Sequence, residues 1–96
     1  MKEIRKTETF TRWLDNLRDT RGRAKVQARL GRLALGNSGD VRAVGAGVSE
    51  LRIDYGPGYR VYYKTIGKEV IILLAGGDKS SQSADIKKAL KLAGNL

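Results

Sequence analysis

The sequence contains no cysteine and no histidine. Without cysteine the chain has no disulfide framework, no thiol nucleophile and no thiolate metal site. Without histidine it lacks the commonest metal ligand and the side chain that most often acts as a general base near pH 7. We therefore expect no metal and no cofactor, and acid–base chemistry has to come from other side chains.

Long apolar runs are absent as well. No stretch approaches the roughly 20 apolar residues that a membrane-spanning helix needs. The charged start, residues 1–6, has no apolar segment of the kind found in a signal peptide. A length of 96 residues is enough for one domain and not for two. We expect a single domain over residues 1–96, located in the cytoplasm and without a membrane partner.

Positive charge is what the chain has in excess. Its 19 Lys and Arg face 10 Asp and Glu, for a formal net charge of +9. Ten of the basic and four of the acidic side chains fall in residues 1–35. An excess of this size favours a polyanionic partner, either nucleic acid or an anionic membrane surface.

Helical periodicity dominates the first third of the chain. Apolar side chains recur at the spacing of a helix face in two runs, Phe10, Trp13, Leu14 and Leu17, then Val26, Leu30 and Leu33. Gly22 is expected to end the first helix, so that the two helices join at a turn over Thr20–Gly22. The second helix is expected to run to Gly36. Residues 2–6 are a candidate for a short strand.

Beyond residue 40 the periodicity drops to two. Residues 51–55 and 59–63 alternate apolar and polar side chains, and Gly56-Pro57-Gly58 between them predicts the tight turn of a β-hairpin. An edge strand is expected over Val41–Gly45. The unbroken apolar run Val70–Ala75 indicates the central strand, covered on both faces.

A final helix follows this strand. Its apolar stripe consists of Ile86, Ala89, Leu90 and Ala93. Asp78 or Ser80 is placed to cap the helix. The order β-α-α-β-β-β-α predicts an α+β fold in which two N-terminal helices pack on an antiparallel sheet with a C-terminal helix.

The second helix is basic on the side opposite its apolar stripe. The basic residues there and just ahead of it are Arg21, Arg23, Lys25, Arg29 and Arg32. A solvated helix face explains such a stripe in many proteins. Here no acidic residue interrupts residues 20–39, and an unbalanced stripe repels itself unless an anion meets it. The pattern therefore also predicts phosphate binding.

The hairpin gathers a second set of polar side chains. Pairing without a bulge places Asp54 opposite Arg60, and Arg52 opposite Tyr62. Strand parity then puts cations and a phenol on one sheet face, namely Arg52, Arg60, Tyr62 and Lys64. This set suits a phosphodiester and a stacked base. Cross-strand pairing of the cations with Glu50 and Asp54 on a solvated face explains the pattern equally well.

The segment Gly77-Asp78-Lys79-Ser80-Ser81 follows the buried strand and opens the last helix. Backbone amides at a helix start, together with Lys79, form a small anion site. An ordinary helix cap is the alternative and the more common use of such a segment. The segment is not a P-loop, because Gly-x-x-x-x-Gly-Lys-Ser/Thr is absent.

Motifs along nearly the whole chain resemble a known family. They are Gly36-Asn37-x-Gly39-Asp40, Val44-Gly45-x-Gly47-Val48-x-Glu50-Leu51-Arg52-Ile53, Tyr55-Gly56-Pro57-Gly58-Tyr59-Arg60-Val61-Tyr62-Tyr63 and Gly76-Gly77-Asp78-Lys79-Ser80-x-Gln82. With the Phe10-x-x-Trp13-Leu14 start, they resemble the "addiction module killer" toxins. These form a HigB-like branch of the RelE/ParE toxin superfamily that includes phage Gp49-like proteins.

The resemblance implies a RelE-like fold and a type II toxin. Such a toxin is held inactive by a cognate antitoxin, which in the HigB-like branch is usually a HigA-like helix-turn-helix protein. RelE-type members cleave mRNA on the ribosome, whereas ParE-type members poison DNA gyrase, so the fold leaves the target open. We expect an endoribonuclease that inhibits translation. The alternatives are a gyrase-directed toxin and a catalytically degenerate protein that only binds an antitoxin.

The resemblance also implies positions for the site. Arg60 matches the arginine of the Gly-Tyr-Arg strand in RelE-type enzymes, and Arg52 matches the arginine of the preceding strand. Lys79 stands where RelE has a second arginine, shortly after the last strand's glycine. The departures are Glu50 near one position of RelE's lysine pair, Asp85 near its late tyrosine, and no C-terminal histidine. No general base is therefore assigned.

For cleavage of RNA by its own 2′-OH, we expect Arg60 to stabilise the phosphorane, with Lys79 as its helper or as the proton-transfer group. Arg52 would hold phosphate, and Tyr62, or else Tyr59, would stack a base or shuttle a proton. A lysine or tyrosine base needs a pKa lowered by neighbouring cations. The side chains expected to bind RNA, including ribosomal RNA, are Lys64, Lys25, Arg29, Arg32, Arg21 and Arg23.

Overall fold

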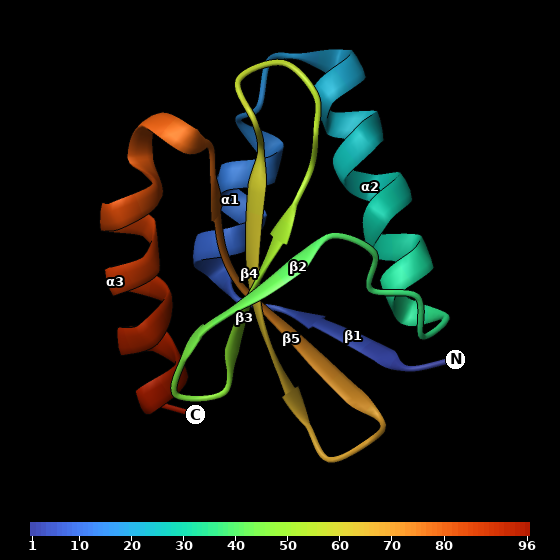
Figure 1. The fold of residues 1–96 in the computed structure, drawn as a ribbon, viewed down its shortest axis with the longest axis vertical. Helices are drawn as coiled ribbons and strands as arrows, with labels where there is room; N and C mark the ends of the chain where they lie inside the picture. The colour runs from blue at the N-terminus through green and yellow to red at the C-terminus, as the bar shows by residue number, and fades with distance from the viewer.

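A computed structural model describes all residues, 1–96 (Figure 1). Its elements in chain order are β1 (Glu3–Lys6), α1 (Glu8–Asp15), α2 (Thr20–Ala34), β2 (Val41–Gly45), β3 (Val48–Arg52), β4 (Arg60–Ile66), β5 (Val70–Gly77), a short 3-10 turn (Lys79–Ser81) and α3 (Gln82–Gly94). The α+β prediction is confirmed, including the edge strand over Val41–Gly45 and the helix after Asp78. None of the three helices combines the length and apolar character that crossing a membrane requires.

The five strands form one sheet in the order β1-β5-β4-β3-β2. The pairs β2–β3, β3–β4 and β4–β5 are antiparallel. The first strand departs from the predicted antiparallel sheet, because β1 pairs with β5 in parallel and Glu3 lies opposite Val70. The chain leaves β1 through α1 and α2 before it returns to the sheet, so β1 is free to join the far edge in this direction.

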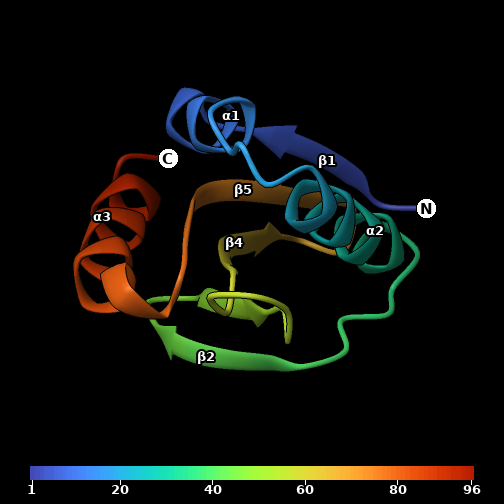
Figure 2. The same ribbon diagram turned by 90° about the horizontal axis from the view of Figure 1, so that it is seen from above.

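Two apolar clusters lie on opposite faces of the sheet. The first contains α1 and α2 side chains packed on strand residues, among them Phe10, Leu14, Val26, Leu30, Leu51, Val61 and Leu73. The second lies beneath α3 and consists of Val48, Tyr62, Leu74, Ala75, Ala89 and Ala93. Figure 2 shows the strands between α2 and α3. Coverage of β5 on both faces, predicted from its unbroken apolar run, is confirmed. The prediction that it is the central strand is wrong, because β4 occupies the centre of the sheet and β5 lies between β4 and β1.

The boundary between α1 and α2 differs from the prediction. The first helix ends at Asp15 and the second begins at Thr20, so Gly22 lies in the first turn of α2. Asp19 is the N-cap, and one of its carboxylate oxygens accepts from the Gly22 amide at 2.9 Å. A Cβ on Gly22 would lie 2.5 Å from the Tyr59 ring. The glycine is therefore explained by this close approach and not by a helix end.

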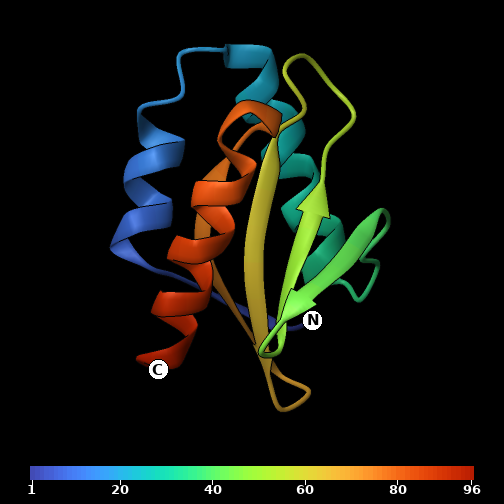
Figure 3. The same cartoon turned by 60° about the vertical axis from the view of Figure 1, so that its left-hand side comes forward.

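The hairpin register also differs from the prediction. Arg52 lies opposite Arg60, and Glu50 lies opposite Tyr62. This is a shift of two residues, because residues 53–59 form a longer loop than the predicted tight turn. An even shift preserves side-chain parity, so the predicted set still shares one face. That face is not solvated, however, since α3 packs across it (Figure 3).

Candidate anion-binding site

A pocket of about 200 Å³ opens where the 53–59 loop meets the end of β5. It is lined by Asp40, Arg52, Ile53, Asp54, Gly56, Gly58, Arg60 and Lys79. The loop and the start of α3 lie at the same end of the molecule (Figure 3), and the Lys79 amide donates to the Pro57 carbonyl at 3.4 Å. The pocket brings together three of the four expected catalytic residues, Arg52, Arg60 and Lys79.

Arg60 is the most enclosed charge of this pocket, with only 4% of its surface exposed. Its Nη1 donates to the carbonyl oxygens of Gly58 and Tyr59, each at 3.1 Å. Its Nε is buried without a partner, and the residue forms no ion pair. A guanidinium whose charge is not compensated inside the protein favours an anion in the pocket.

Arg52 and Lys79 flank Arg60. The Arg52 side chain is half-exposed, and its Nε lies 3.9 Å from Oε1 of Glu50. Lys79 is exposed, and its aliphatic stem crosses Gly58, where an added Cβ would lie 2.9 Å from Lys79 Cγ. The backbone of Gly58 has a φ of +78°, which side chains rarely adopt. A glycine at this position therefore lets the lysine reach the pocket.

The amides that open the last helix are used inside the protein. The Ser80 amide donates to the Asp78 carboxylate at 2.8 Å, and the Ser81 amide donates to the Asp78 carbonyl at 3.3 Å. The Lys79 amide is bonded to Pro57, as described above. Asp78 is thus confirmed as a cap. The alternative of an anion site built from these amides is wrong, because no amide is left free, and only the Lys79 side chain contributes.

Tyr62 does not line the pocket. It is fully buried beneath α3, and its hydroxyl donates to Oε2 of Glu50 at 2.9 Å. Burial, and then this hydrogen bond, raise the pKa of Tyr62 far above its usual value. Tyr59 is buried as well and donates to Asp19 at 2.8 Å. The expectation that either tyrosine stacks a base or shuttles a proton is therefore corrected, since both rings are covered by protein.

Glu50, which the alternation placed on a solvated face, is fully buried. Its Oε2 accepts from Tyr62 and from Gln82 Nε2, the latter at 2.8 Å, and its Oε1 lies 3.5 Å from Arg42 Nε. These contacts join β2, β3, β4 and α3. The Arg52 side chain lies beside the same carboxylate, at 3.9 Å. The sequence did not reveal this network, because Gln82 lies 32 residues from Glu50 in the chain.

Two of the expected RNA-binding arginines also serve the fold. Arg29 Nη1 donates to the Arg52 carbonyl at 2.8 Å, and its Nη2 donates to the Ser38 carbonyl at 3.0 Å. Arg23 donates to the Leu17 carbonyl, beyond the end of α1, and its Nε is buried. Both guanidiniums are thus partly engaged by carbonyl oxygens of the protein, and contact of Arg23 or Arg29 with RNA stays a prediction.

The other expected RNA-binding residues are open to solvent to different degrees. Arg21, Lys25 and Arg32 are exposed on α2, and Lys25 Nζ lies 5.6 Å from the centre of the Tyr55 ring. Lys64 is half-buried on β4, opposite Val48, and lies outside the pocket. The structure therefore gathers three of these cations on one helix and leaves Lys64 apart.

A carboxylate that the sequence analysis did not single out also lines the pocket. Asp40 stands just before β2, and its carbonyl accepts from the Arg52 amide at 2.9 Å. In the sequence, the only sign of this position is the Gly39-Asp40 pair that precedes the edge strand. The pair does not reveal the neighbour of Asp40, because only the register of β2 against β3 places Asp40 beside Arg52.

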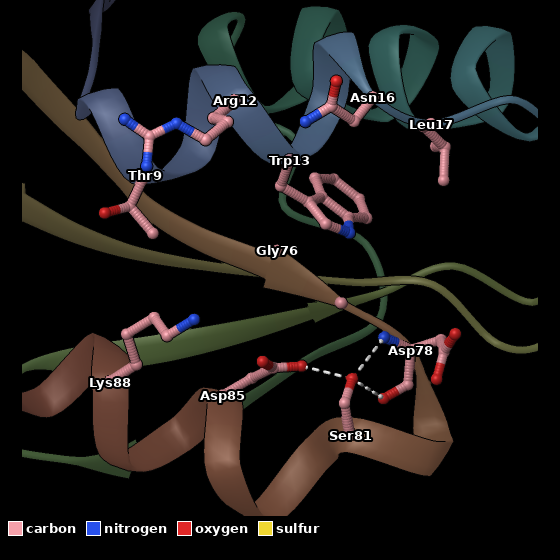
Figure 4. Close-up of a pocket in the computed structure, with 11 residues that line it drawn as sticks. Thr9, Arg12, Trp13, Asn16, Leu17, Gly76, Asp78, Ser81, Asp85 and Lys88 are labelled. Carbon is pink, nitrogen blue, oxygen red and sulfur yellow. Dashed lines mark hydrogen bonds between the residues drawn. The ribbon is translucent and has the colours of Figure 1, made fainter.

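A larger cavity, of about 550 Å³, lies between α1 and α3 at the end of β5 (Figure 4). Trp13 and Arg12 approach it from α1, while Asp85 and Lys88 approach it from α3. Ser81 Oγ donates to Asp85 at 2.5 Å on its floor. Charges of both signs mix here without an enclosed unpaired cation, so we regard the smaller pocket as the candidate site.

A solved structure has the same fold. A double arginine-to-alanine mutant of Escherichia coli toxin RelE in the free state matches 94% of this chain and 95% of that chain, with a TM-score of 0.76 and 15% sequence identity. The class of protein that this architecture defines is therefore the RelE fold, as the motifs predicted.

The sequence comparisons assign the family. Residues 12–95 match the family described as "Phage derived protein Gp49-like (DUF891)". An uncharacterized protein of Haemophilus influenzae is 51% identical over 94 residues, which cover 98% of this chain and 95% of that protein. The chain belongs to the Gp49-like family, and the resemblance seen in its motifs is confirmed.

Proposed function

We propose that this protein is the toxin of a type II toxin–antitoxin module and cleaves mRNA on the ribosome. The observation that carries the proposal is the buried, unpaired guanidinium of Arg60 in one pocket with Arg52 and Lys79. A phosphodiester gains negative charge as 2′-OH attack proceeds, and fixed cations lower the barrier most where that charge develops. The RelE fold and the Gp49-like family support the toxin assignment.

Each cation has a distinct role in this reaction. Arg60 stabilises the phosphorane from within the protein, where its charge is little screened by water. Arg52 binds a non-bridging phosphate oxygen from the neighbouring strand. Lys79 carries three protons on a mobile stem at the mouth of the pocket, so it is placed to protonate the leaving 5′ oxygen.

The partners follow from the same proposal. Arg21, Lys25 and Arg32 contact phosphates of ribosomal RNA along α2, and Lys64 contributes on β4. A cognate antitoxin of the HigA-like helix-turn-helix type neutralises the toxin. Because the ribosome and mRNA are its targets, the protein acts in the cytoplasm.

The test is induced expression without an antitoxin, followed by primer extension on cellular transcripts during the first minutes. We expect cuts inside translated codons and an arrest of growth. Arg60→Ala abolishes both. Arg5→Ala is the matched control, because Arg5 is an exposed arginine on β1 that pairs with Glu3, away from the pocket. It leaves both unchanged.

Three outcomes contradict the proposal in different ways. Continued arrest by a folded Arg60→Ala protein removes Arg60 from the mechanism. Arrest with intact transcripts favours a gyrase-directed toxin. No arrest by the wild-type chain indicates a degenerate toxin that only binds its antitoxin. Circular dichroism of both variants establishes that each is folded.

A further inference from the structure

We infer that Asp40 is the general base of this site and accepts the proton of the attacking 2′-OH. The inference rests on the proposed RNA cleavage, and it names the group that such a reaction requires and that the resemblance left unassigned.

Few side chains of the pocket are able to accept a proton. The chain has no histidine and no cysteine. Its buried tyrosines are poor candidates, since burial raises the pKa of Tyr63, and burial with the hydrogen bond to Asp19 raises that of Tyr59 to about 12. Arginine does not deprotonate in proteins. Asp40, Asp54 and Lys79 are the remaining titratable side chains that line the pocket.

The strand register places Asp40 in a row with the two arginines. Arg52 lies opposite Arg60, and Arg60 lies opposite Gly77. Val41, the first residue of β2, pairs with Leu51 at this end of the ladder. The hydrogen bond from the Arg52 amide to the Asp40 carbonyl extends the ladder by one residue and sets Asp40 opposite Arg52. Residues directly opposite one another project from the same face, with Cβ atoms about 5 Å apart.

The order within this row suits an in-line reaction. The row runs from Asp40 through Arg52 and Arg60 to Gly77. Lys79 comes two residues after Gly77, and its stem lies against Gly58, near the Arg60 end of the row and away from Asp40. Displacement at phosphorus requires the attacking and leaving oxygens on opposite sides. A phosphate held by the two guanidiniums therefore has a carboxylate on one side and an ammonium on the other. Asp54 lies two residues after Arg52, beyond the end of β3 in the loop over residues 53–59, and is not paired opposite either arginine.

The proton and bond changes balance with these groups alone. A carboxylate oxygen of Asp40 takes the 2′-OH proton while the O2′–P bond forms. The P–O5′ bond then breaks, and the Lys79 ammonium gives its proton to O5′. The products are a 2′,3′-cyclic phosphate and a 5′-OH end. Asp40 forms no ion pair inside the protein, so its carboxylate is available for this transfer.

The experiment is single-turnover cleavage of an mRNA fragment bound to ribosomes. Asp40→Asn is compared with Asp54→Asn, which removes the other carboxylate of the pocket, and with the control Asp15→Asn, which changes an exposed aspartate at the end of α1 that does not line the pocket. We expect Asp40→Asn to lower the rate constant by roughly 10²–10⁴-fold. Its Kd for the ribosome–mRNA complex stays equal or falls, because a negative charge beside Arg52 is gone. Asp15→Asn leaves the rate constant unchanged, and Asp54→Asn lowers it less than Asp40→Asn does.

The pH profile of the wild type is a second test that needs no variant. Carboxylates as a class are ionised at pH 6 and above, so a carboxylate base predicts a rate constant that stays level between pH 6 and 8. A lysine or tyrosine base makes it rise about tenfold per pH unit over that range.

Each contrary result has its own meaning. Three results overturn the assignment of Asp40 while RNA cleavage itself stands. They are an unchanged rate constant in Asp40→Asn, a lower rate constant in Asp54→Asn alone, and a wild-type rate constant that rises steadily between pH 6 and 8. No cleavage by the wild type overturns the proposed function and this inference together. Melting temperatures of the three variants establish that they are folded.

Discussion

At the scale of single residues, Arg60 is a charged side chain that is almost completely buried. Its guanidinium has two carbonyl oxygens as partners, one nitrogen without any, and no carboxylate. Removing such a group from water costs desolvation free energy, and the two hydrogen bonds compensate only part of this cost. The stability of the free chain does not explain the residue, which is consistent with the proposed role of Arg60 in binding a phosphate.

This explanation predicts that Arg60→Met stabilises the free protein. Methionine fills a similar space without charge, so we expect the free energy of unfolding to rise by about 1 kcal/mol, and the melting temperature to rise by roughly 4–8 °C. Thermal unfolding followed by circular dichroism measures this. In Arg52→Met, the matched control, the buried Glu50 loses a cation and no stabilisation is expected. A lower melting temperature for Arg60→Met than for the wild type would contradict the argument.

The residues of the site were predictable to different degrees. Arg52, Arg60 and Lys79, which line one pocket, were selected because two of them share strand parity and all three match positions implied by the resemblance. Their catalytic roles stay a prediction. Arg29 was assigned to RNA because charge along a helix does not reveal carbonyl groups elsewhere in the chain. Asp40 was missed because its neighbour depends on the pairing of two strands and not on local sequence.

At the scale of elements, Arg29 joins α2 to β3 and to the loop at Ser38. It supplies donors to two carbonyl oxygens that have little access to water. One of them is the carbonyl oxygen of Arg52. The backbone position of this pocket-lining residue therefore depends on α2, which does not itself line the pocket.

We therefore predict that Arg29→Ala destabilises the fold. Two partly buried carbonyl groups lose their donors, which costs about 1–3 kcal/mol. Arg32→Ala removes an exposed arginine from the same helix and is expected to leave the free energy of unfolding unchanged. Urea unfolding of the two variants measures the difference. Equal stability of both variants would show that the Arg29 bonds do not hold the loop.

The strands illustrate what alternation reveals about an element and what it omits. Alternation located β3 and β4 and the face of each side chain, because a shift of two residues changes no face. It did not give the length of the loop over residues 53–59, which alone fixes the register. It also described Glu50 and Tyr62 as solvated, because a polar side chain covered by a distant helix follows the same pattern as one in water.

At the scale of the whole molecule, the proposed function makes the net charge of +9 the main determinant of binding to RNA. The exposed cations of α2 lie outside the pocket, so in this proposal RNA binding and RNA cleavage use different residues. Phosphate contacts release counterions, and affinity therefore falls steeply with salt.

This separation predicts the behaviour of a triple variant, Arg21→Ala, Lys25→Ala and Arg32→Ala. Each phosphate contact contributes about 1 to the slope of log K against log salt, so we expect the slope to fall in magnitude by about 2–3. Filter binding to ribosomes between 50 and 200 mM salt, about the range over which such effects are large, measures it. A control with Lys68, Lys87 and Lys91 changed to alanine loses the same charge elsewhere and keeps the slope. An unchanged slope in the first variant would remove α2 from the interface.

The parallel pairing of β1 with β5 has a consequence for biosynthesis. Thr7 bonds to a carbonyl 67 residues later, at Leu74, and β1 has no neighbour in the sheet until β5 has been translated. The lysine that completes the pocket follows two residues after β5. A nascent chain interrupted before β5 has neither a closed sheet nor Lys79 in its pocket, so we expect a premature stop or a frameshift ahead of residue 70 to leave an inert fragment.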